Sequence, residues 1–429
     1  MSVSVATPVW VTGLAAAALA VGQGLMLACL IYQAILAAAS ALPTKRASHA
    51  GEKRLRFAIA IPAHNEAAVL AATLARLREQ DYPRELFDVH VAADHCSDAT
   101  AEVTRQGGGI AHERSEPPQG RKAYALQWLL QRILQREPGS LLHPAFLAGY
   151  DAVAIFDADS QVDPGFLAAV EGHLRDGKRV LQGQHIIHNP QDSPLAAMAA
   201  VDMRLNNRLR NQSRANLGLA CRLMGDAMVF DTQVLREHGW PTVSMNEDRE
   251  YGYVLLLNGI RASYVPEARS YGQAASSWRQ AEPQRLRWYR QVPALQRRYA
   301  GRLIGAAVRS RSPALLDGAV ELLMPSYTYL VAGAAVNLIV VIALGLWLPT
   351  VRGLLGVAGS LALLGAWMLY PLAGLWIDRA PGWAYRALWM GPAYLIWRLW
   401  IAVLVRVRGE RIGWVRTQRR EESDRPKPR

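Results

Sequence analysis

The sequence predicts an α/β domain with a mostly parallel sheet, inserted between transmembrane helices. Of the 429 residues, 51% are hydrophobic, and long uncharged runs lie near both ends of the chain. Between about residues 55 and 270, apolar runs of strand length alternate with longer amphipathic stretches. Such alternation is typical of a parallel sheet with helices on both faces. The length is sufficient for one such domain in addition to the membrane segments.

The N-terminal segment, residues 1–45, predicts a transmembrane helix. No Asp, Glu, Lys or Arg occurs in residues 1–44, and the apolar stretch from about residue 9 to 42 is longer than the roughly 20 residues that a bilayer span needs. A secretory signal carries positive charge before a shorter apolar core, whereas here Lys45 and Arg46 follow the run. The positive-inside rule therefore places the N-terminus outside and residue 45 onward in the cytoplasm.

The C-terminal part predicts a transmembrane hairpin at residues 321–378, made of two uncharged runs separated by Arg352. A last apolar stretch, residues 383–405, contains two arginines and four tryptophans, a mixture typical of the headgroup region. We expect this helix to lie in the interface, because a fourth span would put the basic tail outside. The chain is thus predicted to be a multi-pass protein of the cell (inner) membrane with its catalytic domain in the cytoplasm.

The formal net charge of +13 is compatible with nucleic-acid binding. The basic residues, however, cluster after the first span, before the hairpin and in the tail, which is the distribution of a protein that faces anionic lipids. The chain has no zinc-finger spacing and no stacking motif, so we expect no nucleic-acid partner. Cys29, Cys96 and Cys221 are far apart and predict neither a disulfide framework nor a metal site.

Within the soluble domain, residues 46–270, four strands are predicted at residues 56–66, 87–94, 151–160 and 179–187. Polar side chains occur at the carboxyl ends of the first three strands, where parallel sheets bind ligands. These candidates are Pro62, His64 and Glu66 after the first strand, Asp94 after the second, and Asp157 and Asp159 after the third. A single polar strand end could be a helix cap. Three in succession indicate a binding site.

Asp157 and Asp159 predict a divalent metal site. A buried ionised carboxylate is costly unless it is compensated, so two of them after an apolar run call for a cation. Carboxylate oxygens suit Mg²⁺ or Mn²⁺, which commonly bind one or two carboxylates together with substrate phosphates. Neither a Walker loop nor a G-x-G-x-x-G motif occurs. A metal would therefore have to neutralise a nucleotide diphosphate.

Taken together, the motifs over most of residues 57–290 resemble those of membrane-bound, processive-type family-two glycosyltransferases. That family includes cellulose, hyaluronan and poly-N-acetylglucosamine synthases and is related to ceramide glucosyltransferases. The resemblance implies a GT-A-type, Rossmann-like nucleotide-sugar domain between transmembrane helices, with amphipathic interface helices. It also implies a UDP-sugar donor, with the segment Ile-Pro-Ala-His-Asn-Glu and Asp94 holding the uridine, Lys122 near the nucleotide, and Asp157 with Asp159 as the D-x-D pair.

The same resemblance assigns the acceptor side. Asp248 matches the catalytic base of the family's Glu-Asp motif, with Glu247 beside it, and Gln284, Arg287 and Trp288 match the Q-x-x-R-W signature within the basic interface region, residues 271–320. Gly225 and Asp226 lie in a segment that lines the acceptor site in relatives. In the region 379–429, Trp414, Thr417 and Arg419 match a mobile gating loop. Each assignment has an ordinary alternative: an acidic helix start for Asp248, interface anchoring for Trp288, and a solvated tail for the last three.

The predicted enzyme is a hexosyltransferase that inverts the anomeric centre, with Asp248 as base and a metal on the diphosphate. It would move glucose or N-acetylglucosamine to a growing β-linked polysaccharide. The alternative is a single addition to a membrane lipid such as a ceramide-like or polyprenyl acceptor, which the small number of spans favours. Three spans are few for a polymer channel, so a polymer synthase would need a homodimer or a secretion partner.

Overall fold

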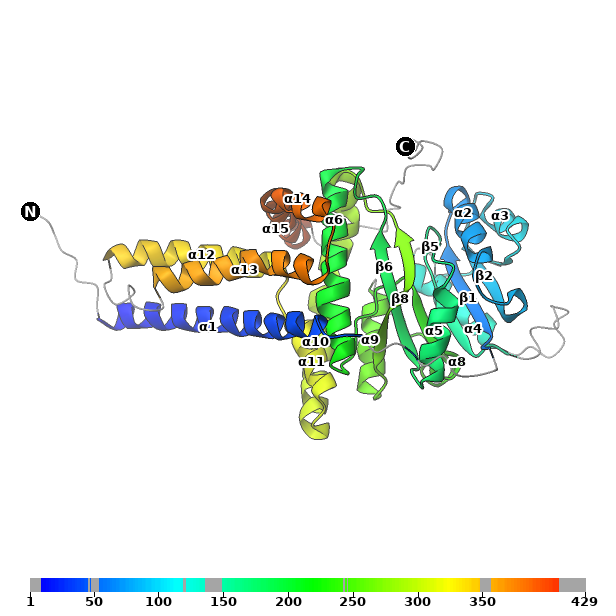
Figure 1. The fold of residues 1–429 in the computed structure, drawn as a ribbon, viewed down its shortest axis with the longest axis horizontal. Helices are drawn as coiled ribbons and strands as arrows, with labels where there is room; N and C mark the ends of the chain where they lie inside the picture. Colours follow the sequence, from blue (N-terminus) through cyan, green and yellow to red (C-terminus); the bar gives the residue numbers. More distant parts are fainter. Residues whose placement is uncertain are drawn as a thin grey trace, which may run out of the picture.

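The computed structural model describes residues 9–44, 47, 54–118, 121–135, 149–241, 244, 246–347 and 356–408. A bundle of long helices projects from one side of a sheet domain, and further helices lie between the two parts (Figure 1). The fold is a mixed α/β structure of GT-A type with apolar helices that flank the domain, as the sequence predicts. The predicted domain boundaries themselves stay predictions.

One eight-stranded sheet forms the centre of the domain, in the order β3-β2-β1-β4-β7-β6-β8-β5. Its strands are β1 (Phe57–Ala63), β2 (Phe87–Asp94), β3 (Ile110–Arg114), β4 (Ala152–Ile155), β5 (Gln161–Val162), β6 (Val180–Ile187), β7 (Met228–Asp231) and β8 (Ala262–Gly272). The four predicted strands are confirmed as β1, β2, β4 and β6. β7 is antiparallel to β4 and β6, and β5 is antiparallel to β8; the other neighbouring pairs are parallel.

The connectivity places a ligand-binding crevice at the end of β1. From β1 the chain moves outward to β2 and β3 and then returns to the opposite side of β1 as β4. In open α/β sheets ligands bind outside the carboxyl ends of the strands at such a reversal. The residues that follow β1 and β4, which include His64 and Asp157, therefore lie on the two sides of this crevice.

Helices cover both faces of the sheet. One face packs against α2 (Ala67–Arg78), α3 (Thr100–Gln106) and α5 (Phe166–Arg175), and the other packs against α4 (Lys122–Leu134), α8 (Thr232–His238) and α9 (Glu247–Leu257). β1 is buried over its whole length, with Phe57 and Ile59 on the first face and Ala58 on the second. Burial on both faces explains why this strand is a continuous apolar run without alternating polar residues.

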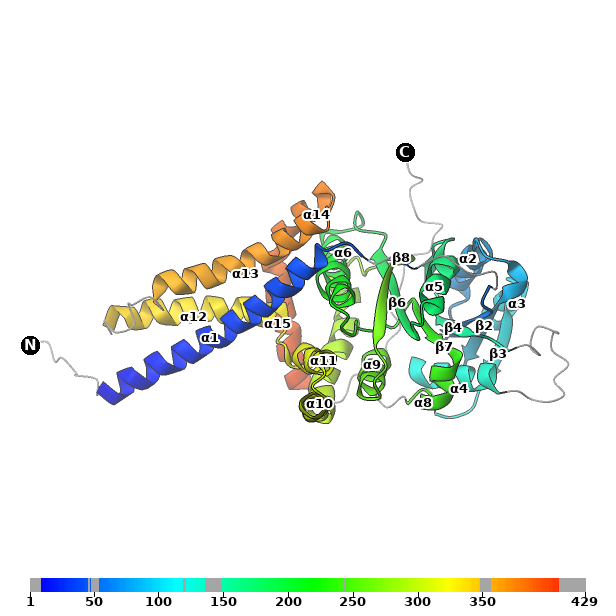
Figure 2. The same cartoon turned by 60° about the horizontal axis from the view of Figure 1, so that its bottom comes forward.

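A layer of helices joins the sheet domain to the bundle of long apolar helices (Figure 2). It contains α6 (Pro194–Leu205), the π-helical segment η3 (Asn206–Gln212), α7 (Ser213–Asn216), α10 (Trp278–Ser310) and α11 (Pro313–Leu323). Ser193 caps α6 by accepting a hydrogen bond from the backbone N–H of Ala196 at 3.1 Å. π-helical turns are rare and often lie at functional sites. The sequence analysis does not anticipate this one.

In the part of the chain that the structure describes, four helical segments are long and apolar enough to cross a membrane: Ala16–Ser40, Tyr327–Gly345, Val357–Ile377 and Gly382–Val407. They belong to α1 (Val9–Ser40), α12 (Tyr327–Trp347), α13 (Val357–Ile377) and the run formed by α14 (Gly382–Ala387), η5 (Leu388–Met390) and α15 (Gly391–Arg408). α1, α12 and α13 run side by side, whereas α15 runs across their direction in both views (Figures 1 and 2). Length and composition thus allow a fourth span. The expectation that residues 383–405 lie in the interface stays a prediction.

Candidate active site

A cavity of about 1000 Å³ lies between the carboxyl ends of β1, β2 and β4 and the joining helices. Every predicted site residue that the structure describes lines this cavity: Pro62, His64, Glu66, Asp94, Lys122, Asp157, Asp159, Gly225, Asp226, Glu247, Asp248, Gln284, Arg287 and Trp288. Trp414, Thr417 and Arg419 lie outside the described residues. The sequence motifs, which are spread over more than 220 positions, therefore meet in one place.

Lys122 joins three of these segments. It begins α4, and its ammonium donates hydrogen bonds to the carboxylate of Asp157 and to the carbonyl oxygen of Gly225, the latter at 2.8 Å. Burial alone would lower the pKa of Lys122, but the charges of Asp157 and Glu247 outweigh burial and raise its pKa. Lys122 is therefore a fixed cation beside the D-x-D pair, where a diphosphate would need charge compensation.

Gly225 brings the acceptor segment close to the predicted base. Its φ of +83° lies in the left-handed region, and a Cβ atom built on it would lie 3.3 Å from Oδ2 of Asp248. A side chain here would strain the backbone and crowd the carboxylate, so glycine suits both needs. The position lets Asp248, Lys122 and the chain around Gly225 approach one another.

Asp226 supports the D-x-D turn. Its Oδ1 accepts hydrogen bonds from the backbone N–H of Asp157 at 3.1 Å and from Oγ of Ser160 at 2.6 Å. Its Oδ2 accepts from Oγ of Ser270 at 2.6 Å and from Nδ1 of His185 at 2.8 Å. Burial alone would raise the pKa of Asp226, but the hydrogen bond and charge of His185 hold it well below its usual range. This geometry gives Asp226 a positioning role, and its predicted acceptor role stays a prediction.

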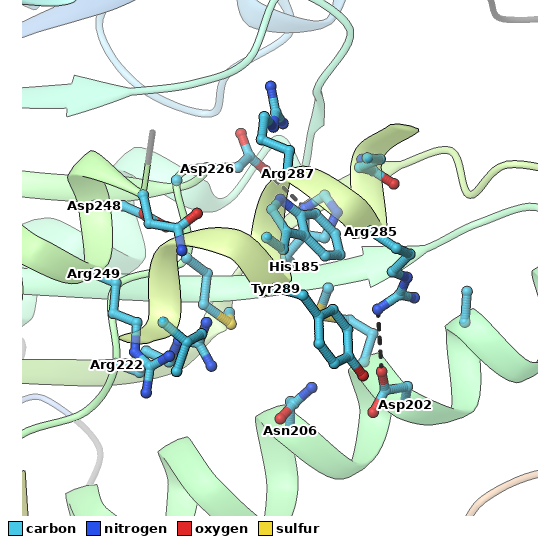
Figure 3. A pocket seen from close by; sticks show the side chains of 18 of the residues that line it. His185, Asp202, Asn206, Arg222, Asp226, Asp248, Arg249, Arg285, Arg287 and Tyr289 are labelled. Atoms are coloured by element: carbon cyan, nitrogen blue, oxygen red, sulfur yellow. Dashed lines mark hydrogen bonds and ion pairs between the residues drawn. The ribbon is translucent and has the colours of Figure 1, made fainter. Parts of the chain in front are cut away.

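His185 lines the cavity and is not among the site residues predicted from the sequence. Burial alone would lower its pKa, but the hydrogen bond and charge of Asp226 outweigh burial and raise it. The two side chains form a largely buried pair (Figure 3), and Asp226 links this pair to the D-x-D turn through the N–H of Asp157. The signal in the sequence is a histidine at an otherwise apolar strand end, in the segment Gln-His-Ile-Ile, which is too common to identify the pair before the fold is known.

Glu247 and Asp248 form the first turn of α9 and line the cavity together. Burial, and secondly the charge of Asp248, raise the pKa of Glu247 to about 7. Acidic residues at a helix N-terminus are favoured by the helix dipole. That ordinary explanation and a catalytic one are compatible here, because the same turn faces Lys122 and Gly225.

At the donor end, Asp94 is buried, and its carboxylate accepts hydrogen bonds from Arg114 and from Nδ1 of His95, the latter at 2.9 Å. Nδ1 of His64 donates to the carbonyl oxygen of Asp94 at 2.6 Å. Asn65 takes a φ of +54°, which lets its Oδ1 accept from the backbone N–H of Ser97 at 2.7 Å. These contacts hold the loops after β1 and β2 together. Arg114, on β3, is a second residue that the sequence analysis misses.

The opposite end of the cavity, toward the membrane helices, is rich in arginine. Asp202 on α6 lies 3.7 Å from Nη1 of Arg285 and 3.6 Å from Nη1 of Arg398 (Figure 3). The guanidinium of Arg285 lies 4.9 Å from the centre of the Trp288 ring, so a cation contacts the aromatic residue of the Q-x-x-R-W signature. Neither Asp202 nor Arg398 is among the site residues predicted from the sequence, because charged residues on amphipathic helices usually face solvent.

The donor set around Asp157 and Asp159 fits a divalent cation that also binds a substrate. Among the described residues, no group of three His, Cys, Asp or Glu side chains is arranged to hold a metal without help. Two carboxylates supply hard oxygen ligands, and the side chain of Asp157 is 42% exposed toward the cavity. Mg²⁺ and Mn²⁺ commonly complete such a pair with phosphate oxygens and water.

Comparison with known proteins gives the family. Residues 54–291 match the family described as glycosyltransferase like family 2. Glucomannan 4-beta-mannosyltransferase 7 of Arabidopsis thaliana is 23% identical over 257 residues, which are 57% of this chain and 44% of the relative. Probable glycosyltransferase YdaM of Bacillus subtilis (strain 168) is 22% identical over 245 residues, 55% of this chain and 54% of the relative. This chain spans about half the length of these curated relatives.

Among solved structures, mannosyltransferase PcManGT from Pyrobaculum calidifontis, in complex with GDP-Man and Mn²⁺, aligns with a TM-score of 0.56 and 20% identity. The alignment covers 90% of this chain and 97% of that one, so the likeness in fold extends over the sheet domain and the flanking helices. The family match covers more than half of the sequence. The chain therefore belongs to glycosyltransferase like family 2, the family whose motifs its sequence resembles.

Proposed function

We propose that this chain is an inverting, metal-dependent hexosyltransferase of the cell membrane that uses a nucleoside diphosphate sugar. The observation that carries the proposal is the convergence of Asp157, Asp159, Lys122 and Asp248 in one cavity at the reversal point of the sheet. A paired carboxylate site, a fixed cation and a separate carboxylate are the groups that glycosyl transfer from a diphosphate requires.

For the donor, Pro62, His64, Glu66 and Asp94 would hold the nucleoside, and Asp157 with Asp159 would hold Mg²⁺ or Mn²⁺. The bound metal would neutralise the diphosphate and stabilise it as the leaving group. Lys122 supplies a second positive charge beside it. The sequence predicts a UDP-sugar of glucose or N-acetylglucosamine. The mannosyltransferase relatives, one of them solved with GDP-Man, make GDP-mannose a donor to test beside these.

For the acceptor, Asp248 would take the proton from the attacking hydroxyl. Attack on C1 from the side opposite the diphosphate would convert an α-linked donor into a β-linked product. Because burial and the charge of Asp248 raise the pKa of Glu247 to about 7, Glu247 holds a proton below that pH. A protonated Glu247 reduces the repulsion that an ionised Asp248 would otherwise meet, which supports Asp248 as the base.

The sequence predicts a growing polysaccharide as acceptor, on the strength of Gln284, Arg287 and Trp288. A second acceptor, a membrane lipid that receives a single sugar, is favoured by one structural observation. The cavity wall includes Tyr32 and Leu36 of α1 and Tyr327 at the start of α12. The helices that would cross the bilayer therefore border the reaction space directly. We favour the lipid acceptor on this ground.

Purified full-length protein in nanodiscs can test this function with radiolabelled UDP-glucose, UDP-N-acetylglucosamine and GDP-mannose. Asp248→Asn should bind the donor normally in calorimetry and transfer roughly 10²–10⁴-fold more slowly, because the base acts in the chemical step. Asp231→Asn is the matched control, since Asp231 caps α8 through the N–H of Gln233, and asparagine also serves as a cap. Transfer by Asp248→Asn within threefold of wild type would exclude Asp248 as base. Sizing the product separates a long polymer from a single-sugar lipid.

A further inference from the structure

Arg222 lies in the segment that leads to Gly225, and a buried side chain on the π-helical segment fixes its backbone. The N–H of Arg222 donates to Oδ1 of Asn211 at 3.0 Å, and its carbonyl oxygen accepts from Nδ2 of Asn211 at 3.3 Å. Asn211 belongs to η3 and is 1% exposed. The position of Arg222 is therefore set before any ligand arrives.

The guanidinium of Arg222 is poorly compensated. Its Nε is buried and has no hydrogen-bond partner among the described residues. The acidic side chains of α11 are engaged by other groups. Glu321 accepts from Arg249 at 3.1 Å and from Tyr253 at 2.6 Å. Burial, and secondly the charge of Arg249, lower the pKa of Arg222. A buried cation of this kind is stabilised by a bound anion.

The second carboxylate of α11 is likewise occupied. Asp317 accepts a hydrogen bond from Nε of Arg214 at 2.8 Å and one from the hydroxyl of Tyr32 at 2.6 Å. Arg214 and Asp317 are both buried, so this pair is a fixed part of the wall. The two ion pairs of α11 thus account for Arg214 and Arg249. Arg222 also lines the cavity but forms no ion pair among the described residues, and the charges of Glu321 and Asp248 only partly offset its own.

The surroundings of Arg222 define what such an anion belongs to. Arg222 lies next to Arg249 and close to Asp248 (Figure 3). The cavity wall also includes apolar and aromatic side chains from the neighbouring helices, among them Leu36 of α1, Met324 and Tyr327. An anion at Arg222 would therefore lie between the predicted base and the apolar side chains of the helices that would cross the bilayer. A phosphate that joins a hydroxyl-bearing headgroup to acyl chains has this arrangement.

We propose that Arg222 binds the phosphate of an anionic phospholipid acceptor, whose headgroup hydroxyl faces Asp248 and whose chains pass between α1 and the start of α12. This inference rests on the proposed glycosyl transfer and names its acceptor. In the reaction the headgroup oxygen bonds to C1 of the sugar. The bond from C1 to the diphosphate breaks with its electron pair on the diphosphate, and the hydroxyl proton passes to Asp248.

Binding tests the inference without any need for turnover. Dihexanoyl-phosphatidylglycerol, a short soluble probe with a phosphate and headgroup hydroxyls, is titrated into the full-length protein by calorimetry. Arg222→Gln should weaken binding about 10- to 100-fold, the effect of one charge-assisted pair. Arg222→Lys should restore part of the loss. Arg309→Gln is the matched control: Arg309 is an exposed arginine of α10 outside the cavity wall, so removing it tests general attraction to anions.

Unchanged donor binding in each variant shows that the fold is intact. Equal binding of the probe by wild type and Arg222→Gln would overturn the inference even if sugar transfer is observed. Failure of donor binding in wild type would instead count against the proposed function. The two failures are therefore distinguishable.

Transfer then identifies the source of the phosphate. Nanodiscs of phosphatidylcholine, which has no headgroup hydroxyl, are doped with phosphatidylglycerol or with diacylglycerol. We expect labelled product with phosphatidylglycerol, at least tenfold less with diacylglycerol, and a raised KM for phosphatidylglycerol in Arg222→Gln with kcat little changed. Equal transfer to diacylglycerol would overturn the role of the phosphate. If soluble glycerol phosphate accepts the sugar as efficiently as phosphatidylglycerol does, the proposal that the acceptor is a lipid is overturned.

Discussion

The two ends of the cavity are built from opposite charges. At the donor end carboxylates dominate, and neighbouring strand ends hold them: Asp226 is held by Ser160 and Ser270, and Asp94 by Arg114. At the membrane end arginines dominate, and helices distant in sequence hold them, as in the pair Arg249 and Glu321. The donor end depends on the topology of one sheet. The membrane end depends on how α9, α10 and α11 pack together.

The difference has a chemical consequence. Asp157 and Asp159 would repel an anionic ligand unless a cation lay between them, so the proposed diphosphate donor would need a metal at this end. The membrane end already carries excess positive charge and can accept an anion directly. Under the proposed function, one cavity would bind two negatively charged substrates and keep them apart, because each end would recognise its anion by a different means.

Removal of the metal should produce the largest effect, and it is the most direct test of the difference between the two ends of the cavity. We expect excess chelator, or Asp159→Asn with metal present, to lower transfer by about 10³-fold, because the metal supplies several kcal/mol of charge stabilisation. Donor binding should fall in parallel, whereas binding of dihexanoyl-phosphatidylglycerol should change less than about twofold. Calorimetry with each ligand, with and without Mn²⁺, measures both.

Asp231→Asn, which makes the same chemical change on the surface, controls for the substitution itself. Full turnover in chelator would show that Lys122 alone compensates the diphosphate. A parallel loss of phospholipid binding would show that the two ends are not independent.

The next largest effect is expected from Asp226→Asn. The change removes the negative charge that Nδ1 of His185 and Oγ of Ser270 face, and an amide nitrogen cannot accept their hydrogen bonds. We expect a loss of about 1–3 kcal/mol in the free energy of unfolding. We also expect a raised KM for the donor, because the turn from Asp157 to Ser160 loses its support. His185→Gln should show a smaller effect in the same direction.

Steady-state kinetics and thermal unfolding of the same preparations check this prediction. If Asp226→Asn instead raises the KM for the acceptor and leaves the donor KM unchanged, Asp226 acts in the acceptor site, as the family resemblance implies. That result would assign Asp226 to the acceptor end of the cavity and not to the donor end.

The contrast between the two ends also explains what the sequence could predict. Asp94, Asp157 and Asp159 directly follow apolar strands, and the carboxyl ends of parallel strands meet at one sheet edge, so their convergence follows from local patterns. Asp202 and Arg222 lie in segments whose neighbours come from other helices, and no spacing in the sequence relates them. The π-helical turn, which brings Asn211 to Arg222, has no reliable sequence signal either.

The strands differ in the same way in how well the sequence predicts them. β1, β2, β4 and β6 are apolar runs that stand out in the sequence. β7 has four residues and β5 has two, which are too few for periodicity to identify, and β8 carries Pro266 and charged residues. Every antiparallel pair of the sheet includes β5 or β7, and the pair with the register shift includes β8. A mostly parallel sheet was predictable, and its exact order was not.

A third prediction concerns Glu247, which lies where the two ends meet. Its pKa rises from 4.5 to about 7 in the folded protein, so the folded state binds a proton that the unfolded state has released in this pH range. The folded protein should therefore lose stability as pH rises from about 4.5 to 7, by on the order of 3 kcal/mol. Glu247→Gln should remove this slope and make the protein more stable at pH 8.

Thermal unfolding in detergent from pH 5 to pH 8 measures the slope for both proteins. Glu237→Gln is the matched control, since Glu237 is a surface carboxylate that pairs with Arg179. A wild-type slope that survives in Glu247→Gln would assign the titration to another group and would weaken the case for a protonated Glu247 beside Asp248.

The smallest expected effect concerns the membrane helices, and it tests whether both ends of the cavity are insensitive to the interior of the bundle. Gln23 of α1, Asn337 of α12 and Ser360 of α13 are buried together, and Oδ1 of Asn337 accepts from Nε2 of Gln23 at 3.0 Å and from Oγ of Ser360 at 2.9 Å. Hydrogen bonds between membrane helices contribute about 0.6–1.7 kcal/mol each. Asn337→Leu keeps a similar volume but removes this acceptor, so we expect a loss of about 1 kcal/mol in the free energy of unfolding and a melting temperature lower by about 2–4 °C.

Val336→Leu, on the exposed side of the same helix, should change neither quantity. Donor and phospholipid affinities should remain within about twofold of wild type in both variants, because the cluster does not line the cavity. A large loss of phospholipid binding in Asn337→Leu would show that the packing of α1 against α12 controls the entry path, and the membrane end would then have to be redefined to include the bundle.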